Sequence, residues 1–165
     1  MIQINLETLV MGNIPGTSMM ILRPYSKSPY HDRLLPICIG TVEAASIGKA
    51  INKEKNSRPI PHSLILNMMT QLGGKLKYII IDKVQSTTFY ATLVVERVNQ
   101  TFKIDARPSD AVALALRMRV PMFVDEKVLI SASFPAWVNT EQGIQKAEAA
   151  EFHKFVSTLE PDDFN

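Results

Sequence analysis

The chain alternates short apolar, β-branched stretches with polar segments that carry proline or glycine. IQINLETLVMG and TSMMILRP are separated by the turn signal NIPG, which predicts an N-terminal hairpin. LLPICI predicts a third strand after the polar loop YSKSPYHD. Three further strands, which together form a meander, are predicted in KLKYIIIDKV, TFYATLVVER and QTFKIDA, and a seventh is predicted in VPMFVDEKVLI.

Apolar positions spaced by three and four residues predict the helices. The first runs over about 42–54, with Ile47 and Ile51 in its apolar stripe. The second runs over about 63–72 and ends at Gly73-Gly74. It is expected to bury four residues: Ile65, Met68, Met69 and Leu72. The third, over about 108–118, is apolar all round from Ala111 to Leu116, so it should be covered by other elements. A polar-faced helix is predicted over 142–159.

Strands grouped before and between helices, without strict alternation, favour an α+β fold. We expect a mostly antiparallel mixed sheet of about seven strands, with three to four helices packed against it. The 165 residues suit one domain, and no repeat or linker interrupts them. Residues 1–140 should form the α+β domain. Residues 141–165 should form a C-terminal helix and acidic tail, packed on that domain or extending from it.

Composition narrows the class of protein. With 46% hydrophobic and 21% charged residues, the chain has the balance of a soluble globular protein. The net charge of +2 neither demands nor excludes a polyanionic partner. Cys38 is the single cysteine, which rules out an internal disulfide and fits a reducing compartment. No signal-peptide pattern and no apolar run of about 20 residues is present, so we expect a cytoplasmic protein with no membrane partner.

The segment KIDARPSDAVALALRMRVP concentrates polar groups at the start of the third helix. Asp105 and Arg107 alternate with apolar neighbours, which predicts that they share one strand face. Pro108 suits the first helical position, and Asp110 falls in the first turn, near the positive end of the helix dipole. A structural interpretation is complete in itself: an ion pair of Arg107 with an aspartate secures the corner.

Other polar residues also depart from the apolar pattern. Glu43 lies on the inward stripe of the first helix, and Asp82 lies at a strand position that should be apolar. Arg58 and His62 come just before the second helix. Carboxylates can hold a divalent metal or act as a general base, a guanidinium can bind phosphate, and an imidazole can transfer a proton. The combination suits phosphodiester chemistry, although no spacing matches a fixed ligand motif.

Four blocks resemble, in order and separation, the bifunctional nuclease domain family: LPICIGTVEAASI, RPIPHSLILNMMTQLGG, TFYATLVV and KIDARPSDAVALALRMRVPMFV. The resemblance runs from about residue 34 to the end of the chain. It implies one compact α+β domain, usually self-associating, and an activity that cleaves both RNA and DNA. One departure concerns His62: this chain has Pro61 and Ser63 where the family usually has threonine and aspartate.

Two hypotheses follow. Under the nuclease hypothesis the catalytic residues are Glu43, His62, Asp105 and Asp110. Asp105 and Asp110 are also candidate ligands for Mg²⁺ or Mn²⁺, and the substrate is bound by Arg58, Arg107 and Ser109. The expected partners are nucleic acid and further copies of the chain. The alternative is a non-catalytic regulatory or interaction module, whose polar cluster is structural or binds an anionic ligand. The modest net charge favours the module.

Overall fold

The computed structural model describes residues 1–11, 18–53 and 57–136. The strands in these ranges are β1 (Ile2–Met11), β2 (Ser18–Pro24), β3 (Arg33–Ile39), β4 (Lys75–Gln85), β5 (Thr88–Arg97), β6 (Gln100–Ala106), β7 (Met122–Val124) and β8 (Phe134–Pro135). The helices are α1 (Thr41–Ile51), α2 (Pro61–Gln71), α3 (Pro108–Met118) and α4 (Glu126–Ala132). The NIPG turn, the helix predicted over 142–159 and the 141–165 tail lie outside the described residues.

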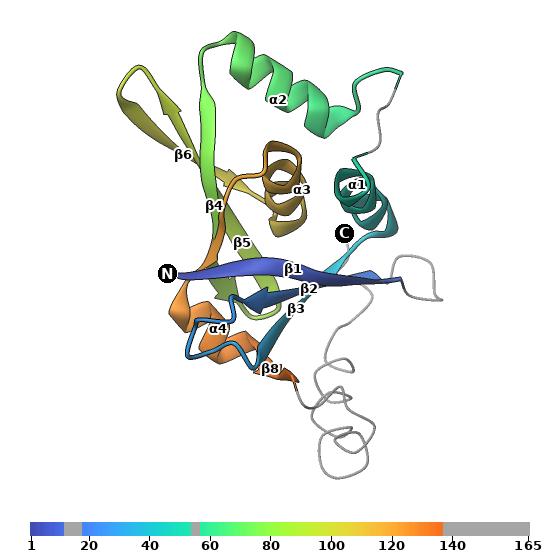
Figure 1. Ribbon diagram of the computed structural model, residues 1–165, viewed down its shortest axis with the longest axis vertical. Coiled ribbons are helices and arrows are strands. Elements are labelled where there is room, and N and C mark those ends of the chain that lie inside the picture. The colour runs from blue at the N-terminus through green and yellow to red at the C-terminus, as the bar shows by residue number, and fades with distance from the viewer. Residues whose placement is uncertain (12–17, 54–56, 137–165) are drawn as a thin grey trace.

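The strands form one mixed sheet in the order β6-β5-β4-β7-β1-β2-β3-β8. Each neighbouring pair is antiparallel except β4 and β7, which are parallel. α1 and α3 lie side by side, and α2 packs against α3 (Figure 1). The predicted α+β class, with a mostly antiparallel mixed sheet, is confirmed.

The core lies between the sheet and α1 and α3. Every residue of α3 from Ala111 to Ala115 is buried, and these residues pack over Ile79, Ile81 and Leu93 of the sheet. The prediction that this helix is covered by other elements is therefore confirmed. α3 also begins as predicted, because proline lacks the N–H that would go unpaired in the first turn.

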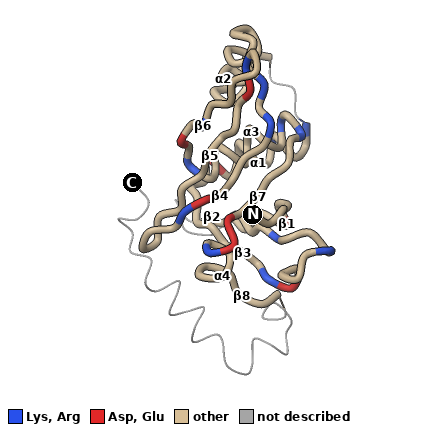
Figure 2. The backbone as a smooth tube through the Cα atoms, turned by 90° about the vertical axis from the view of Figure 1, so that its left-hand side faces the viewer, with Lys and Arg blue, Asp and Glu red and all other residues tan. Residues whose placement is uncertain are grey.

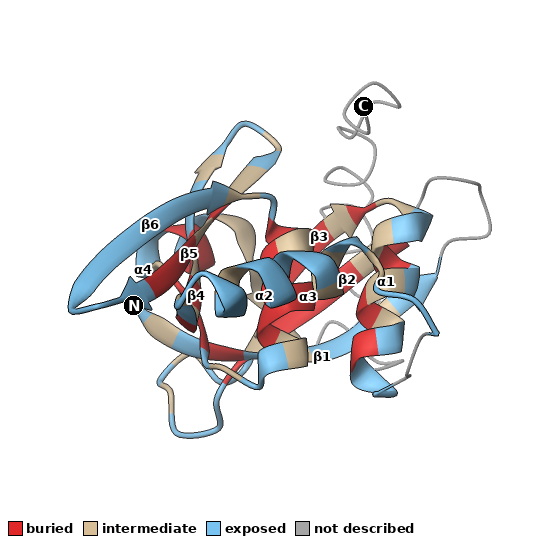
Figure 3. Cartoon of the chain, turned by 90° about the horizontal axis from the view of Figure 1, so that it is seen from above, coloured by how far each residue is buried: buried red, intermediate tan, exposed pale blue. Residues whose placement is uncertain are grey.

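The predicted buried face of α2 is wrong. Ile65, Met68 and Leu72 are each about half exposed or more, Met69 is partly buried, and Leu66 is the buried residue instead. α2 is apolar on several sides, so periodicity could not select the inward face. α2 lies outside α3 and makes its main helix contacts with it, so much of its surface faces solvent. Figure 3 shows the outward surfaces of α2 and β6 as exposed.

The predicted seventh strand is too long. Only Met122–Val124 form β7, and Asp125 then caps α4 by accepting a hydrogen bond from the Lys127 backbone N–H at 2.9 Å. An aspartate that accepts a hydrogen bond from an otherwise unpaired N–H of the first turn strongly favours the start of a helix at that point. α4 buries Val128 and Leu129. Among the described residues, no helix has the length and apolar character needed to cross a membrane.

Candidate functional site

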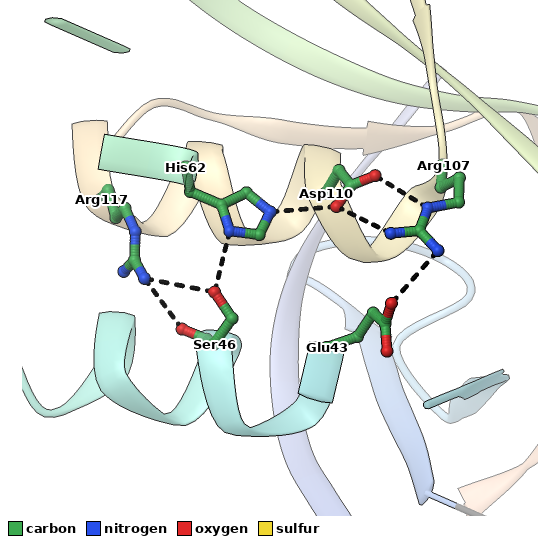
Figure 4. Close-up of polar contacts among 6 residues, drawn as sticks. All are labelled: Glu43, Ser46, His62, Arg107, Asp110 and Arg117. Atoms are coloured by element: carbon green, nitrogen blue, oxygen red, sulfur yellow. Dashed lines mark hydrogen bonds and ion pairs between the residues drawn. The ribbon is translucent and has the colours of Figure 1, made fainter. Parts of the chain in front are cut away.

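The first turns of three helices meet on one side of the molecule. Glu43 lies in the first turn of α1, His62 is the second residue of α2, and Asp110 lies in the first turn of α3. Arg107 is the N-cap residue of α3. Figure 4 shows these side chains directed toward one another, together with Ser46 from α1. Residues that are far apart in the sequence therefore form one connected polar network.

Arg107 joins the two acidic groups of this network. Its Nε donates to Asp110 Oδ2 at 2.9 Å, and its Nη2 donates to Asp110 Oδ1 at 3.3 Å. Its Nη1 lies 3.2 Å from Glu43 Oε1. The hydrogen bond to Asp110 raises the pKa of Arg107. The Arg107 side chain is 66% exposed, against 22% for Glu43 and 29% for Asp110, so the cation faces solvent and the carboxylates lie behind it.

His62 is held from both sides. Its Nε2 lies 3.0 Å from Asp110 Oδ1, and its Nδ1 lies 2.9 Å from Ser46 Oγ. Hydrogen bonds from His62 and then from Arg107 lower the pKa of Asp110 to about 2, against the opposing effect of burial. The carboxylate is therefore ionised at neutral pH and can only accept. In the neutral imidazole, Nε2–H donates to Asp110 and Nδ1 accepts from the Ser46 hydroxyl.

Arg117, in the last turn of α3, completes the network. Its Nη2 donates to the Ser46 carbonyl oxygen at 3.1 Å and to Ser46 Oγ at 3.3 Å, and burial lowers its pKa. Ser46 and Arg117 were not among the predicted site residues. Helical spacing could have indicated both, because Ser46 is three residues after Glu43 and Arg117 is seven after Asp110.

Three predicted site residues lie outside the network. Arg58 is exposed before α2 and makes no hydrogen bond or ion pair with another described residue, and Ser109 is buried at 6% exposure. Asp105 pairs with Thr92, whereas the neighbouring Leu93 faces the core, so Asp105 points away from α3. The predicted shared strand face of Asp105 and Arg107 is wrong, because β6 ends at Ala106 and Arg107 is the N-cap residue of α3.

Asp82 shares the outer sheet face with Asp105, since its Oδ2 accepts from Thr92 Oγ1 at 2.6 Å. The structure does not bring Asp105 and Asp110 together, and they were predicted to bind one metal ion. Among the described residues, no group of three or more His, Cys, Asp or Glu side chains is arranged to hold a metal ion. In the network, Arg107 and His62 already occupy both oxygens of Asp110.

Residues 21–136 match a family model described as the bifunctional nuclease domain. An uncharacterized protein of Mycobacterium tuberculosis is 39% identical over 137 residues, which cover 81% of this chain and 82% of that protein. Bifunctional nuclease 1 of Oryza sativa subsp. japonica is 23% identical over 121 residues, 66% of this chain and 37% of the plant protein. Bifunctional nuclease 1 of Arabidopsis thaliana is 24% identical over 101 residues, which cover 59% of this chain and 31% of the Arabidopsis protein.

Proposed function

The chain belongs to the bifunctional nuclease domain family, and we propose that it hydrolyses phosphodiester bonds in RNA and DNA. The name of the plant relatives motivates the reaction class. One observation carries the proposal: an imidazole is held between a hydroxyl and an ionised carboxylate, beside an exposed guanidinium. A proton acceptor, a group that orients it and a phosphate-binding cation thus lie next to one another.

His62 is the proposed proton-transfer residue. With Nε2–H donating to Asp110, Nδ1 is the basic nitrogen. The Ser46 hydroxyl passes its proton to Nδ1 and takes one from the attacking water, as the water oxygen bonds to phosphorus. The imidazolium then returns a proton to the departing oxygen of the substrate as the phosphorus–oxygen bond breaks. The Asp110 carboxylate orients the ring and stabilises its charged form.

Arg107 is the proposed phosphate contact at this centre, because its guanidinium is the most exposed cation of the network. Glu43 positions Arg107 from the other side. Arg58 remains a proposed additional contact, since it is exposed and precedes His62 by four residues. We assign no step to Asp105, whose side chain points away from α3. Cleavage should be measured with Mg²⁺, with Mn²⁺ and with EDTA, because the residues alone do not select a metal.

A non-catalytic module is the second candidate function. It is favoured by the pairing of Arg107 with both acids, which leaves no free carboxylate in the network. The network also ties α1, α2 and α3 together. Under this alternative the polar residues only stabilise the packing of the three helices.

Replacement of Arg107 separates the two candidates. If Arg107 binds the scissile phosphate, Arg107→Ala should lower cleavage of labelled RNA and single-stranded DNA about tenfold, mainly through KM. The matched control is Arg97→Ala, which removes an exposed arginine of β5. The module would be supported if the wild-type protein cleaved neither RNA nor single-stranded DNA and if Arg107→Ala, but not Arg97→Ala, had a markedly lower melting temperature. Equal cleavage by wild type and both variants would place the activity elsewhere.

Self-association is a further part of the proposal. Leu64, Ile65, Met68 and Leu72 form one exposed apolar face of α2. β6 is an edge strand of the sheet, so one row of its backbone N–H and C=O groups has no strand partner among the described residues. Antiparallel pairing of β6 with a second copy, centred on Ile104, sets each Lys103 opposite an Asp105 of the other copy. This complementarity favours a second copy of the chain as the partner.

Measuring the oligomeric state of a variant tests the antiparallel β6 pairing centred on Ile104. Ile104→Lys places two like charges opposite each other on the two-fold axis, so the assembly should dissociate to monomers in light scattering coupled to size exclusion. Val42→Lys is the matched control, because Val42 is an isolated exposed residue on α1. A monomeric wild-type protein, or dissociation by both variants, would refute the β6 interface.

A further inference from the structure

A cavity of about 920 Å³ lies at the opposite ends of α1 and α3 from the Arg107 end of the network. Four cationic side chains among the described residues line it. Lys49 lies in the last turn of α1 and Lys53 follows that helix, whereas Arg117 lies in the last turn of α3 and Arg119 caps it. Basic positions beside α1 and α3 are visible in Figure 2. α2 contributes Asn67, Thr70 and Ser63, which add neutral hydrogen-bonding groups. We call this site the cationic groove.

The positive charge of the cationic groove is not neutralised by the described residues around it. Among the described residues that line it, the one carboxylate is that of Glu7, which lies 3.0 Å from Arg23 Nε. Lys49, Lys53 and Arg119 form no ion pair with any residue that the structure describes. Arg117 Nε is buried and has no hydrogen-bond partner among the described residues. A partly desolvated cation without a carboxylate is costly, and a bound anion would offset that cost.

Helix dipoles account for part of this charge. Lys49 and Arg117 lie in the last turns of α1 and α3, where a cation is favourable. Lys53 and Arg119 lie after the helices in left-handed backbone, with φ of 55° and 53°. Glycine or asparagine adopts that conformation at lower cost. The dipoles favour cations near these two helix ends, but they do not require a strained backbone at positions 53 and 119 or that all four cations line one cavity.

We propose that the cationic groove binds the phosphate backbone of a single nucleic-acid strand and leads it to His62. This inference rests on the proposed nuclease function and specifies the form of its substrate. The volume is in the range of cavities that enclose small ligands, about 300–1,000 Å³, so it can enclose a short length of single strand and is too small to enclose a duplex. None of the described residues that line it is aromatic, which favours phosphate contacts over base stacking.

Arg117 connects the cationic groove to the polar network. It lines the cavity, and its Nη2 is bonded to Ser46, whose Oγ contacts His62 Nδ1. Lys49 follows Ser46 by three residues, about one helical turn along α1. A strand held by Lys49 and Arg117 would therefore pass within one turn of the proposed proton acceptor.

Salt-dependent binding tests the proposal. The probe is a short fluorescein-labelled oligouridine, titrated by anisotropy against the His62→Ala chain so that cleavage does not consume it. Each phosphate contact on a single strand contributes about −0.7 to the slope of log K against log salt. The double variant Lys53→Gln/Arg119→Gln should make that slope less negative by about 1.4. Lys75→Gln/Lys127→Gln removes two exposed charges elsewhere and should leave the slope unchanged.

The outcomes separate this proposal from the nuclease itself. If both double variants change the slope equally, or neither does, the cationic groove is not the binding site, even where the wild-type protein still cleaves RNA. If only the double variant Lys53→Gln/Arg119→Gln binds more weakly, and neither the wild-type protein nor any variant cleaves RNA, the cationic groove is supported and the nuclease function fails. A matched duplex that binds with the same affinity and slope would overturn the preference for a single strand.

Discussion

His62→Ala is expected to reduce the rate of RNA and single-stranded DNA cleavage about 10²–10⁴-fold, the usual contribution of general acid–base catalysis. The loss should fall on kcat, because the imidazole transfers protons and Arg107 with the cationic groove supplies the proposed binding contacts. The His62 side chain is 13% exposed, so water can reach the imidazole although most of the ring is shielded from solvent. Steady-state kinetics on purified variants measure the effect.

His31→Ala is the matched control for this experiment. His31 is exposed and uses Nδ1 only to contact the Ser28 carbonyl oxygen, far along the chain from the network. Cleavage should therefore be unchanged in His31→Ala. If His62→Ala cleaved at the wild-type rate while remaining folded, His62 would not be the proton-transfer residue. A melting temperature close to that of wild type would exclude unfolding as the cause of any loss.

Asp110→Asn should produce the second large effect, on stability as a function of pH. The pKa of Asp110 is 3.8 in the unfolded reference and about 2 in the folded chain. The ionised carboxylate thus contributes about 2 kcal/mol above pH 4. Because the folded pKa is the lower one, this contribution is present at neutral pH. It is lost as the pH falls from about 4 toward 2, through the folded pKa.

Urea unfolding followed by circular dichroism, repeated across this pH range, measures the effect. Wild type should be more stable than Asp110→Asn at neutral pH, and the two curves should converge near pH 2. Lys127→Gln, which removes a surface charge outside the network, should keep the wild-type profile. A stability difference between wild type and Asp110→Asn that stayed constant with pH would show that the His62 and Arg107 hydrogen bonds do not lower this pKa.

Local signals located most of the elements. Pro108 marked the start of α3, and glycine marked the end of α2, where Gly73 has a φ of 77°. An ion pair of Arg107 with an aspartate was also expected, and the structure shows that the partner is Asp110, three residues further on. Such features depend on neighbours within a few residues, which a single sequence contains in full.

Other features needed the packed chain. The end of β7 and the start of α4 were missed because apolar residues fit either element, and the capping hydrogen bond of Asp125 decided between them. Asp105 was placed beside Arg107 by strand alternation, but the chain leaves the strand at Ala106. The exposed face of α2 depends on which helix lies next to it, a fact that no local spacing contains.

The sequence by itself determined the residue types at the site, the starts of the helices that carry Glu43 and Asp110, and the family to which the chain belongs. It placed His62 just before α2, whereas the helix begins at Pro61 and includes His62. Only the tertiary structure decided that Ser46 and Arg117 join them and that Asp105 does not. The contacts of Ser46 with His62 and Arg117 span 16 and 71 residues. Such contacts arise from how α1, α2 and α3 pack on the sheet, since that packing sets which helix faces meet.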